Sequence, residues 1–302
     1  MIDRKVESLL AVAEEKNYTK AARRLSLTQP AVSQHISQLE RELGVPLFIR
    51  GKGTIRPTPA GEVVIRYARR LNTIYDRLKT SLSDLDKELT RLRIGVTHTA
   101  ESNIVAEVLA EYGRLNPGVV ITILTDSIRN LYRRLDNYDL DLAIMEGAAS
   151  VPDFDFMLLD TDYLVCAMSN DHRLAGRPMV TLRDLVKERM ILRLSESGTM
   201  NLFASSLESM GRSIDEFNII LEVDNIATIK DLIRKNMGVS ILPKSTCMDE
   251  VSKGKMTILP IENMSMTRET RIVYPKDFNH PQVLQDLTDL YGRISKRSRK
   301  NG

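Results

Sequence analysis

The sequence predicts an α/β protein made of a small, largely α-helical head, one long helix and a two-lobed α/β body. Three observations lead to this fold class. Residues 1–58 contain short helical patterns and a glycine-rich hairpin, residues 59–90 keep one helical repeat, and residues 91–302 alternate strands with helices. A chain of 302 residues, 42% of them hydrophobic and 27% charged, is long enough for two or three folded units.

Composition excludes several classes of protein. The apolar positions near the N-terminus are interrupted by charges, and no apolar run approaches the roughly 18 residues of a membrane span. We therefore expect a cytoplasmic protein with no membrane partner. Two cysteines, Cys166 and Cys247, are too few for a disulfide framework, and the four histidines show no ligand spacing. We accordingly expect no metal site and no cofactor.

Charge is unevenly distributed along the chain. Residues 1–58 hold 10 lysines and arginines against 6 aspartates and glutamates, whereas residues 91–290 hold 22 against 29. Residues 291–302 add 5 basic residues and no acidic one. A basic head on an acidic body indicates that the head alone meets a polyanion, although a chance distribution of surface charge has the same appearance.

Three helices are predicted in the head. The first covers residues 2–16, and the second runs from a cap at Thr19 to Leu25. The third is capped by Thr28, tolerates a proline in its first turn and is ended by Gly44. Two short helices followed by a longer one, with a tight turn between the second and third, are typical of a helix-turn-helix.

The third helix has two different faces. Its core stripe is Val32, Ile36, Leu39 and Leu43, spaced four, three and four residues apart. The other face holds short polar side chains and an amide, which suit close approach to base edges in a DNA groove, whereas an ordinary solvated face would hold more lysine and glutamate. The residues of this helix and its cap that we expect to contact DNA are Thr28, Gln29, Pro30, Ser33, Gln34 and Ser37.

A basic hairpin follows the third helix. Gly51 and Gly53 mark a tight turn between two short strands, and Arg50, Lys52 and Arg56 cluster around it. These features predict a winged helix-turn-helix whose wing contacts phosphates or the minor groove through the three basic residues. A surface hairpin that is basic by chance fits the same residues.

The stretch from Asn17 to Glu62 resembles the N-terminal signature of LysR-type transcriptional regulators. The matching motifs are A-A-x-x-L-x-x-T-Q-P-A-V-S, then I-x-x-L-E-x-x-L-G-x-x-L-F-x-R, then T-x-A-G. One departure is Gly53, at a wing position where the family often has arginine, and we expect Lys52 to take the place of that arginine. The resemblance continues more weakly along the chain. It implies a sequence-specific, DNA-binding transcriptional regulator that responds to a small molecule bound by its body.

Residues 59–90 are predicted to form a linker helix that pairs two chains. A helix of about 28 residues would be ~42 Å long, which exceeds one small domain and favours pairing over packing within the same domain. The resemblance implies the same homodimer, assembled further into a homotetramer, and RNA polymerase is a further candidate partner. Paired heads would bind an imperfect inverted repeat in double-stranded DNA. The predicted coiled-coil seam is Val64, Ala68, Leu71, Tyr75, Leu78, Leu82, Leu85 and Leu89.

The body is predicted to have two α/β lobes. Its βαβαβ order indicates a mostly parallel sheet. The alternation of strands and helices restarts near Tyr163, and a late strand at residues 271–275 leads back to the first lobe. This order predicts a hinged, periplasmic-binding-protein-like fold, which the resemblance also implies. We expect lobe I to comprise residues 91–161 and 268–302, and lobe II residues 162–267.

Hydroxyl and amide side chains follow several predicted strands, where ligands of such folds bind. These groups suit a carboxylate or another oxyanion, although each of them could simply cap a helix. We expect an anionic small-molecule effector between the lobes, such as an organic acid or an amino-acid-like metabolite. The expected effector-binding residues are Thr97, His98, Thr99, Thr125, Ser127, Ser197, Thr199 and Asn225.

Three other functions would each require features of their own. An enzyme would need a catalytic motif, but the chain has no G-x-S-x-G, P-loop, G-x-G-x-x-G or H-E-x-x-H sequence, and the pairs Asp153 with Asp155 and Asp160 with Asp162 are predicted to lie in loops. We therefore expect no catalytic residues. A solute-binding protein would need export. A redox-sensing regulator would need paired or activated cysteines.

Overall fold

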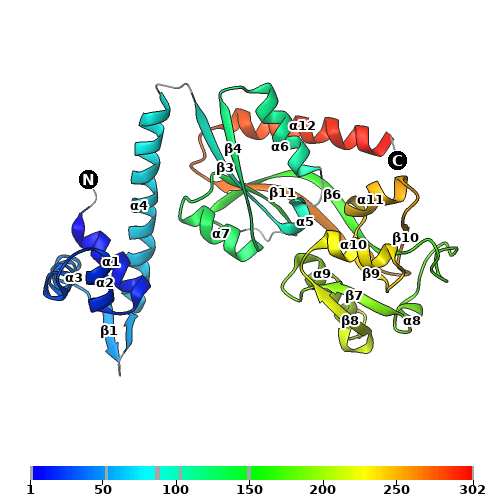
Figure 1. The fold of residues 1–302 in the computed structure, drawn as a ribbon, viewed down its shortest axis with the longest axis horizontal. Coiled ribbons are helices and arrows are strands. Elements are labelled where there is room, and N and C mark those ends of the chain that lie inside the picture. Colours follow the sequence, from blue (N-terminus) through cyan, green and yellow to red (C-terminus); the bar gives the residue numbers. More distant parts are fainter. Residues whose placement is uncertain (1–2, 52–53, 86–88, 102–103, 148–150, 301–302) are drawn as a thin grey trace. The chain divides into compact units, whose positions relative to one another are not determined.

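The computed structural model describes the chain in five stretches, residues 3–51, 54–85, 89–101, 104–147 and 151–300. The chain divides into two compact units (Figure 1). The first comprises Met1–Thr90 with Asp136–Asp139, and the second comprises Arg91–Leu135 with Leu140–Gly302. None of the described helices combines the length and the apolar composition needed to cross a membrane.

The head has the predicted order of elements. They are α1 (Arg4–Glu15), α2 (Tyr18–Arg24), α3 (Gln29–Leu43), the hairpin β1 (Phe48–Gly51) and β2 (Thr54–Pro57), and α4 (Pro59–Leu85). Thr28 caps α3 as predicted, and Gly44 ends it with a left-handed φ of 69°. The predicted cap Thr19 is wrong, because Asn17 accepts hydrogen bonds from the backbone amides of Thr19 and Lys20.

The head is built around one apolar core. Val32 and Ile36 of α3 are buried in it, and Leu39 is partly buried against it. The prediction that Leu43 belongs to this stripe is wrong: its side chain is 47% exposed, because it is the last residue of α3 and lies beyond the core. The full set of buried core residues is Leu9, Ala11, Val12, Ala21, Ala22, Val32, Ile36, Leu47, Ile65 and Ala68.

Three polar or small residues lock the hairpin to the helices on either side of it. The Glu40 carboxylate accepts a hydrogen bond from the Leu47 amide at 2.7 Å. Thr58 Oγ1 donates to the Pro46 carbonyl at 2.7 Å and accepts from the Gly61 amide at 2.8 Å. A Cβ atom on Gly61 would lie 2.0 Å from the Leu47 carbonyl oxygen. The helix, hairpin and linker therefore meet where only glycine fits.

Helix α4 carries an apolar stripe that differs in part from the predicted seam. Ala68 is buried in the head core and Val64 packs against it, because the first turns of α4 complete that core. The side chain of Leu85 lies outside the described residues, and Leu89 follows the end of the helix. The exposed apolar stripe is Val63, Tyr67, Leu71, Ile74, Leu78 and Leu82.

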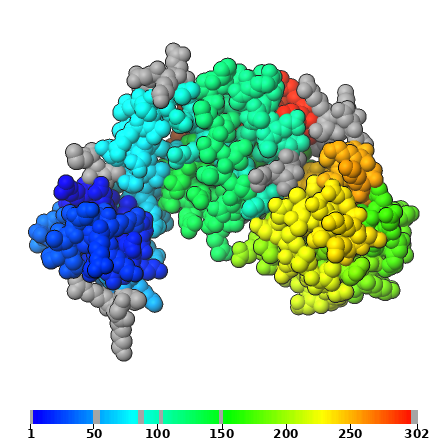
Figure 2. Space-filling model, in the orientation of Figure 1, coloured from blue at the N-terminus to red at the C-terminus, as the bar shows by residue number. Residues whose placement is uncertain are grey.

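The body has two lobes joined by two long strands. Lobe I contains β3 (Thr90–Val96), α5 (His98–Glu101), α6 (Val105–Leu115), β4 (Val119–Thr125), α7 (Ile128–Asp136), β5 (Leu142–Glu146) and α12 (Pro281–Lys300). Lobe II contains α8 (Leu182–Leu185), β7 (Arg189–Arg193), α9 (Gly198–Ser209), β8 (Asn218–Val223), α10 (Ile226–Arg234), β9 (Ser240–Pro243), α11 (Lys244–Ser252) and β10 (Thr257–Leu259). In Figure 2, α10 and α11 lie within the yellow and orange surface of lobe II.

Strands β6 (Phe154–Met168) and β11 (Thr267–Pro275) pair antiparallel and belong to both lobes. The larger sheet has the strand order β10-β6-β11-β5-β3-β4, with β9 also paired to β6. The prediction of a mostly parallel sheet is wrong. Strand β5 is parallel to β3, but β11 is antiparallel to both β5 and β6, because the chain returns from lobe II in the opposite direction.

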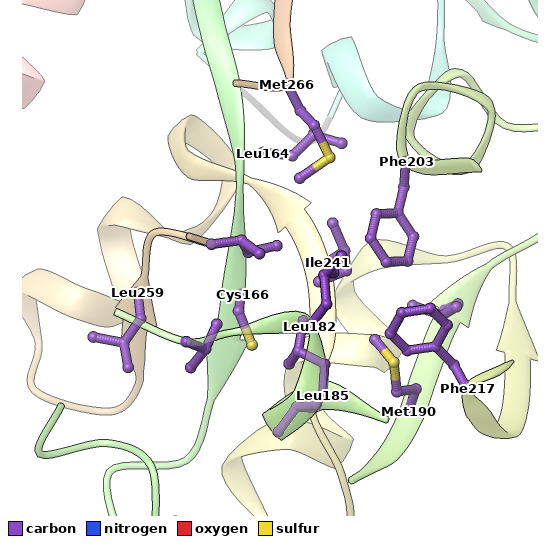
Figure 3. Close-up of a cluster of buried hydrophobic side chains, with 14 of the residues drawn as sticks. Leu164, Cys166, Leu182, Leu185, Met190, Phe203, Phe217, Ile241, Leu259 and Met266 are labelled. Atoms are coloured by element: carbon purple, nitrogen blue, oxygen red, sulfur yellow. The ribbon is translucent and has the colours of Figure 1, made fainter. Parts of the chain in front are cut away.

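Each lobe has its own apolar core. In lobe I, helices α6 and α12 pack on β3, β5 and β11. In lobe II, Phe203 and Phe217 make an edge-to-face contact with ring centroids 5.7 Å apart, beside Cys166 and Ile241 (Figure 3). The prediction that Asp155, Asp160 and Asp162 lie in loops is wrong, because all three lie on β6.

The contact between Gly61 and the hairpin yields a test of stability. We expect Gly61→Ala to lower the free energy of unfolding of the head by about 1–3 kcal/mol, because the backbone oxygen of Leu47 cannot rotate away from the added methyl group. Urea unfolding of the full chain, followed by circular dichroism, measures this change. Gly113→Ala in α6 is the control, since its Cβ would meet nothing within 4 Å. Equal stability of Gly61→Ala and the unsubstituted chain would contradict the expectation.

Candidate functional site

The polar face of α3 is open to solvent. Gln34 and Ser37 are exposed and Ser33 is partly exposed, while Val32 and Ile36 on the other side of the helix are buried. At the start of the helix, the expected contact residues Thr28, Gln29 and Pro30 are all exposed. The structure therefore presents all six of these residues at the surface, on a helix held by its apolar side.

Two polar contacts help to fix α3 against α1. Ser8 Oγ and His35 Nδ1 lie 2.7 Å apart, and Ser8 is fully buried. Lys5 Nζ lies 2.6 Å from a carboxylate oxygen of Glu42 near the end of α3. A side-chain contact near the middle of the helix and another near its end hold the orientation of its exposed face.

The hairpin after α3 has the predicted form of a wing. Its two strands pair antiparallel from Phe48 with Pro57 to Gly51 with Thr54. Arg56 is exposed on β2. The side chain of Arg50, and Lys52 as a whole, lie outside the described residues. Only one of the three basic residues predicted for this wing is therefore placed.

The second unit contains a polar cavity of about 280 Å³ between its two lobes. It lies where β3 and β4 of lobe I and β7 of lobe II are followed by α5, α7 and α9, beside the end of β5. A cavity of this size suits a small metabolite. Its lining residues are Thr97, His98, Thr99, Asp126, Ser127, Ile128, Asn130, Glu146, Arg193, Leu194, Glu196, Ser197, Gly198, Asp224 and Arg268.

Five of the eight residues predicted to bind an effector line this cavity, namely Thr97, His98, Thr99, Ser127 and Ser197. Ser197 also caps α9 by accepting a hydrogen bond from the Met200 amide at 3.2 Å, and Ser127 accepts one from the Asn130 amide at 3.4 Å. Hydroxyl groups from both lobes are therefore brought together.

The other three predicted residues are not part of the lining. Asn225 is exposed and caps α10, accepting a hydrogen bond from the Thr228 amide at 3.2 Å. Thr199 is only 1% exposed, and its hydroxyl lies 3.5 Å from Arg268 Nη1, behind the cavity wall. Thr125 precedes the turn whose next two residues reach the cavity. Asn225 thus caps a helix, which is the alternative to ligand binding that the sequence left open.

Sequence reasoning missed a buried ion pair in this cavity. Arg268 Nη2 donates to Glu146 Oε1 at 3.0 Å, and the two side chains are 4% and 2% exposed. Asp162 on β6 lies 3.8 Å from the same guanidinium, and Thr97 Oγ1 lies 3.4 Å from the other Glu146 oxygen. Burial raises the pKa of Glu146 above its ordinary value, although Arg268 acts in the opposite direction.

A second arginine from lobe II lies in the same cavity. Arg193 is buried and donates to both the backbone oxygen and the carboxylate of Asp224, the latter at 3.1 Å. Burial lowers the pKa of the Arg193 guanidinium, and Asp224 and Glu146 oppose that shift. Asp224 Oδ2 also lies 3.7 Å from His98 Nε2, so that a residue of lobe II contacts one of lobe I.

Asp126 is held by donors from its own helix. Its carboxylate accepts hydrogen bonds from the Ser127 amide at 2.8 Å, from Asn130 Nδ2 at 2.6 Å and from Arg134 Nε at 3.3 Å. Burial works against ionisation, but these hydrogen bonds outweigh it and lower the pKa of Asp126. This carboxylate is therefore a fixed negative charge at the start of α7.

One sequence signal could have identified the missed residues. Glu146 ends the apolar strand LAIME, and Arg193 ends the apolar strand RMILR. Charged residues are seldom buried without a partner, so a charge at the end of an apolar strand indicates either a structural ion pair or a ligand site.

Both thiols are buried in lobe II. Desolvation raises the pKa of Cys247 to about 12 and raises that of Cys166 as well. Cys166 packs among the apolar side chains of Figure 3, and both residues are free cysteines. A protonated thiol in an apolar core is a poor nucleophile, which disfavours the redox-sensing alternative.

A helix-turn-helix with an exposed polar face, joined to a two-lobed domain with a polar cleft, defines the class of ligand-responsive DNA-binding proteins. Comparison with known families agrees. Residues 4–62 match the family described as bacterial regulatory helix-turn-helix protein, lysR family, and residues 86–293 match the LysR substrate binding domain. The chain therefore belongs to the LysR family: it is a DNA-binding transcriptional regulator with an effector-binding domain, and not an enzyme.

Individual relatives show similarity along most of the chain. It is 29% identical to the transcriptional activator CmpR of Synechocystis, over 94% of this chain and 92% of that protein. It is 27% identical to the regulator CysL of Bacillus subtilis, over 89% of each. The solved complex of full-length CbnR with its target DNA has the same fold, with a TM-score of 0.66 and 19% identity over 97% of this chain and 99% of that one.

The state of the thiols can be checked by chemical labelling. We expect neither Cys166 nor Cys247 to react with a disulfide reagent in the folded chain, and we expect no acceleration between about pH 7 and pH 9, because a raised pKa keeps both thiols protonated there. Absorbance of the released thiolate measures the reaction, and the denatured chain, in which both thiols react, is the control. Rapid labelling of either folded thiol would favour redox sensing.

Proposed function

We propose that this regulator binds an imperfect inverted repeat through the exposed face of α3 and that a small molecule bound between the lobes of its body controls that binding. The single observation that supports DNA recognition is the exposure of Gln34 and Ser37 opposite the buried Val32 and Ile36. An amide can form two hydrogen bonds with an adenine edge, and short neighbours allow close approach. Residues 1–58 thus serve as the DNA-binding domain.

The body, residues 91–302, serves as the effector-binding domain. The hydroxyls of Thr97, Thr99, Ser127 and Ser197 face one cavity from two lobes, so a bound molecule contacts both. A ligand that contacts both lobes favours one arrangement of the hinge over the other, since its affinity differs between them. We propose a small organic acid or amino-acid-like metabolite, because hydroxyl-bearing residues at helix starts and two arginines, Arg193 and Arg268, line the cavity.

The linker, residues 59–90, serves to pair two chains. Its exposed apolar stripe from Val63 to Leu82 continues over most of a 27-residue helix, and each of its six side chains is about half exposed. A contiguous apolar stripe of this length is costly in water and is covered by a matching helix of a second copy. We propose a homodimer through this stripe and a dimer of dimers beyond it. We also propose that the protein works in the cytoplasm, where it contacts the DNA that it regulates.

The recognition face is tested by Gln34→Ala. We expect the variant to lose discrimination at one position in each half of the repeat, by about 1–3 kcal/mol, because the amide that distinguishes the bases is gone. Mobility shifts on operator variants measure this loss. Arg56→Ala is the comparison, since loss of a phosphate contact should weaken binding to every sequence and reduce its salt dependence. Unchanged base preference in Gln34→Ala would place recognition on another face.

The paired linker is tested by Leu78→Glu. This change places a carboxylate in the middle of the exposed stripe, and we expect it to weaken pairing by several kcal/mol, because the charge would be buried without a partner. Light scattering gives the molar mass. Ser83→Glu is the matched control, since Ser83 is exposed on the other side of the same helix. A stable monomer of the unsubstituted chain at micromolar concentration would contradict the proposal.

A further inference from the structure

Two arginine side chains in the cleft have unused hydrogen-bond donors. The side chains of Arg193 and Arg268 are 3% and 4% exposed, and both residues line the cavity between the lobes. The Nε atom of each is buried and has no hydrogen-bond partner among the residues that the structure describes. A buried guanidinium normally satisfies its five N–H donors, so two such groups in one cavity require an explanation.

The partners that these arginines do have leave room for another acceptor. Arg268 is paired with Glu146 at 3.0 Å, but its contact with the Thr199 hydroxyl is long, at 3.5 Å. Arg193 donates to Asp224, whose own side chain is 52% exposed. Neither guanidinium is thus fully enclosed by acceptors from the chain.

Acidic and basic side chains both line the cavity. Of the four acidic residues in the lining, Asp126 accepts hydrogen bonds from side chains of its own helix, and Glu196 is exposed. The other two are paired with the arginines, Glu146 with Arg268 and Asp224 with Arg193.

We propose that Arg193 and Arg268 are specificity-determining residues that bind one oxyanion group of the effector, a carboxylate or a phosphate, through their Nε–H donors. A planar guanidinium donates parallel hydrogen bonds to such groups, which a lysine cannot reproduce. Arg193 belongs to lobe II, and Arg268 lies on the strand that joins the lobes. One anion bound by both residues therefore fixes the position of lobe II relative to the joining strands, while the hydroxyls of Thr97, Thr99 and Ser127 select the rest of the molecule.

This inference rests on the proposed effector cleft, and calorimetry on the full chain tests the two separately. The probes are malonate, L-glutamate and inorganic phosphate, each compared with chloride at equal ionic strength. The variants are Arg193→Lys and Arg268→Lys, which keep a positive charge beside Asp224 and Glu146, so that no buried carboxylate loses its counter-charge. Arg189→Lys and Arg271→Lys are matched controls on the same two strands, because neither residue lines the cavity.

We expect at least one probe to bind with one site per chain. Each cleft variant should lower the affinity for that probe about tenfold or more, which is the effect of a lost charge-assisted hydrogen bond. Both controls should bind the probe as the unsubstituted chain does. Binding of the carboxylates but not of phosphate, or the reverse, identifies the oxyanion.

If both cleft variants bind a probe as well as the unsubstituted chain does, the inference is overturned. In that case, weaker binding by Thr99→Val leaves the effector cleft standing, and unchanged binding by Thr99→Val rejects the cleft as well. Failure of every probe to bind also overturns the inference, because the two arginines recognise the group that the probes represent.

Discussion

The body depends on the pairing of β6 with β11. The register runs from Thr267 opposite Tyr163 to Pro275 opposite Phe154, with one irregularity after Thr270. Because the same two strands contribute to both lobes, each lobe is a separate core built on a shared pair of strands. A hinge of this kind allows the lobes to rotate while the residues at the crossing stay in place. The charged residues of the crossing, Asp162 and Arg268, are opposite each other in this shared pair of strands.

A buried ion pair at such a crossing is poor evidence for stability. Removing two charges from water costs about as much as their attraction returns, and apolar residues of similar volume would serve a purely structural role equally well. The Arg268 and Glu146 pair lies instead at the wall of a cavity, beside hydroxyls from both lobes and a second buried arginine. Its location is better explained by recognition of a ligand than by the stability of the fold.

The sequence predicts elements that depend on neighbouring residues better than it predicts contacts between distant residues. Capping residues identify α3 from its cap at Thr28 to its end at Gly44, because a helix boundary is specified by neighbouring residues. The antiparallel crossing was missed, since the direction of β11 depends on a return from lobe II more than a hundred residues after β5. The hydroxyls of the cleft follow from strand ends. The pairing of Glu146 with Arg268 joins residues 122 positions apart, so the charge that ends the strand LAIME indicates a buried group but not its partner.

The head shows why a strong sequence signature is an incomplete guide to function. Glu40, Thr58 and Gly61 match the family motif, and each has a structural task at the junction of helix, hairpin and linker. Such tasks are the same whatever DNA sequence is bound, so they explain why the motif identifies a family rather than an operator. Gln34 and Ser37 contribute little to the core and are free to vary with the target. The same division is proposed for the body, where the crossing strands build both lobes and the polar side chains at the ends of the strands are the proposed ligand contacts.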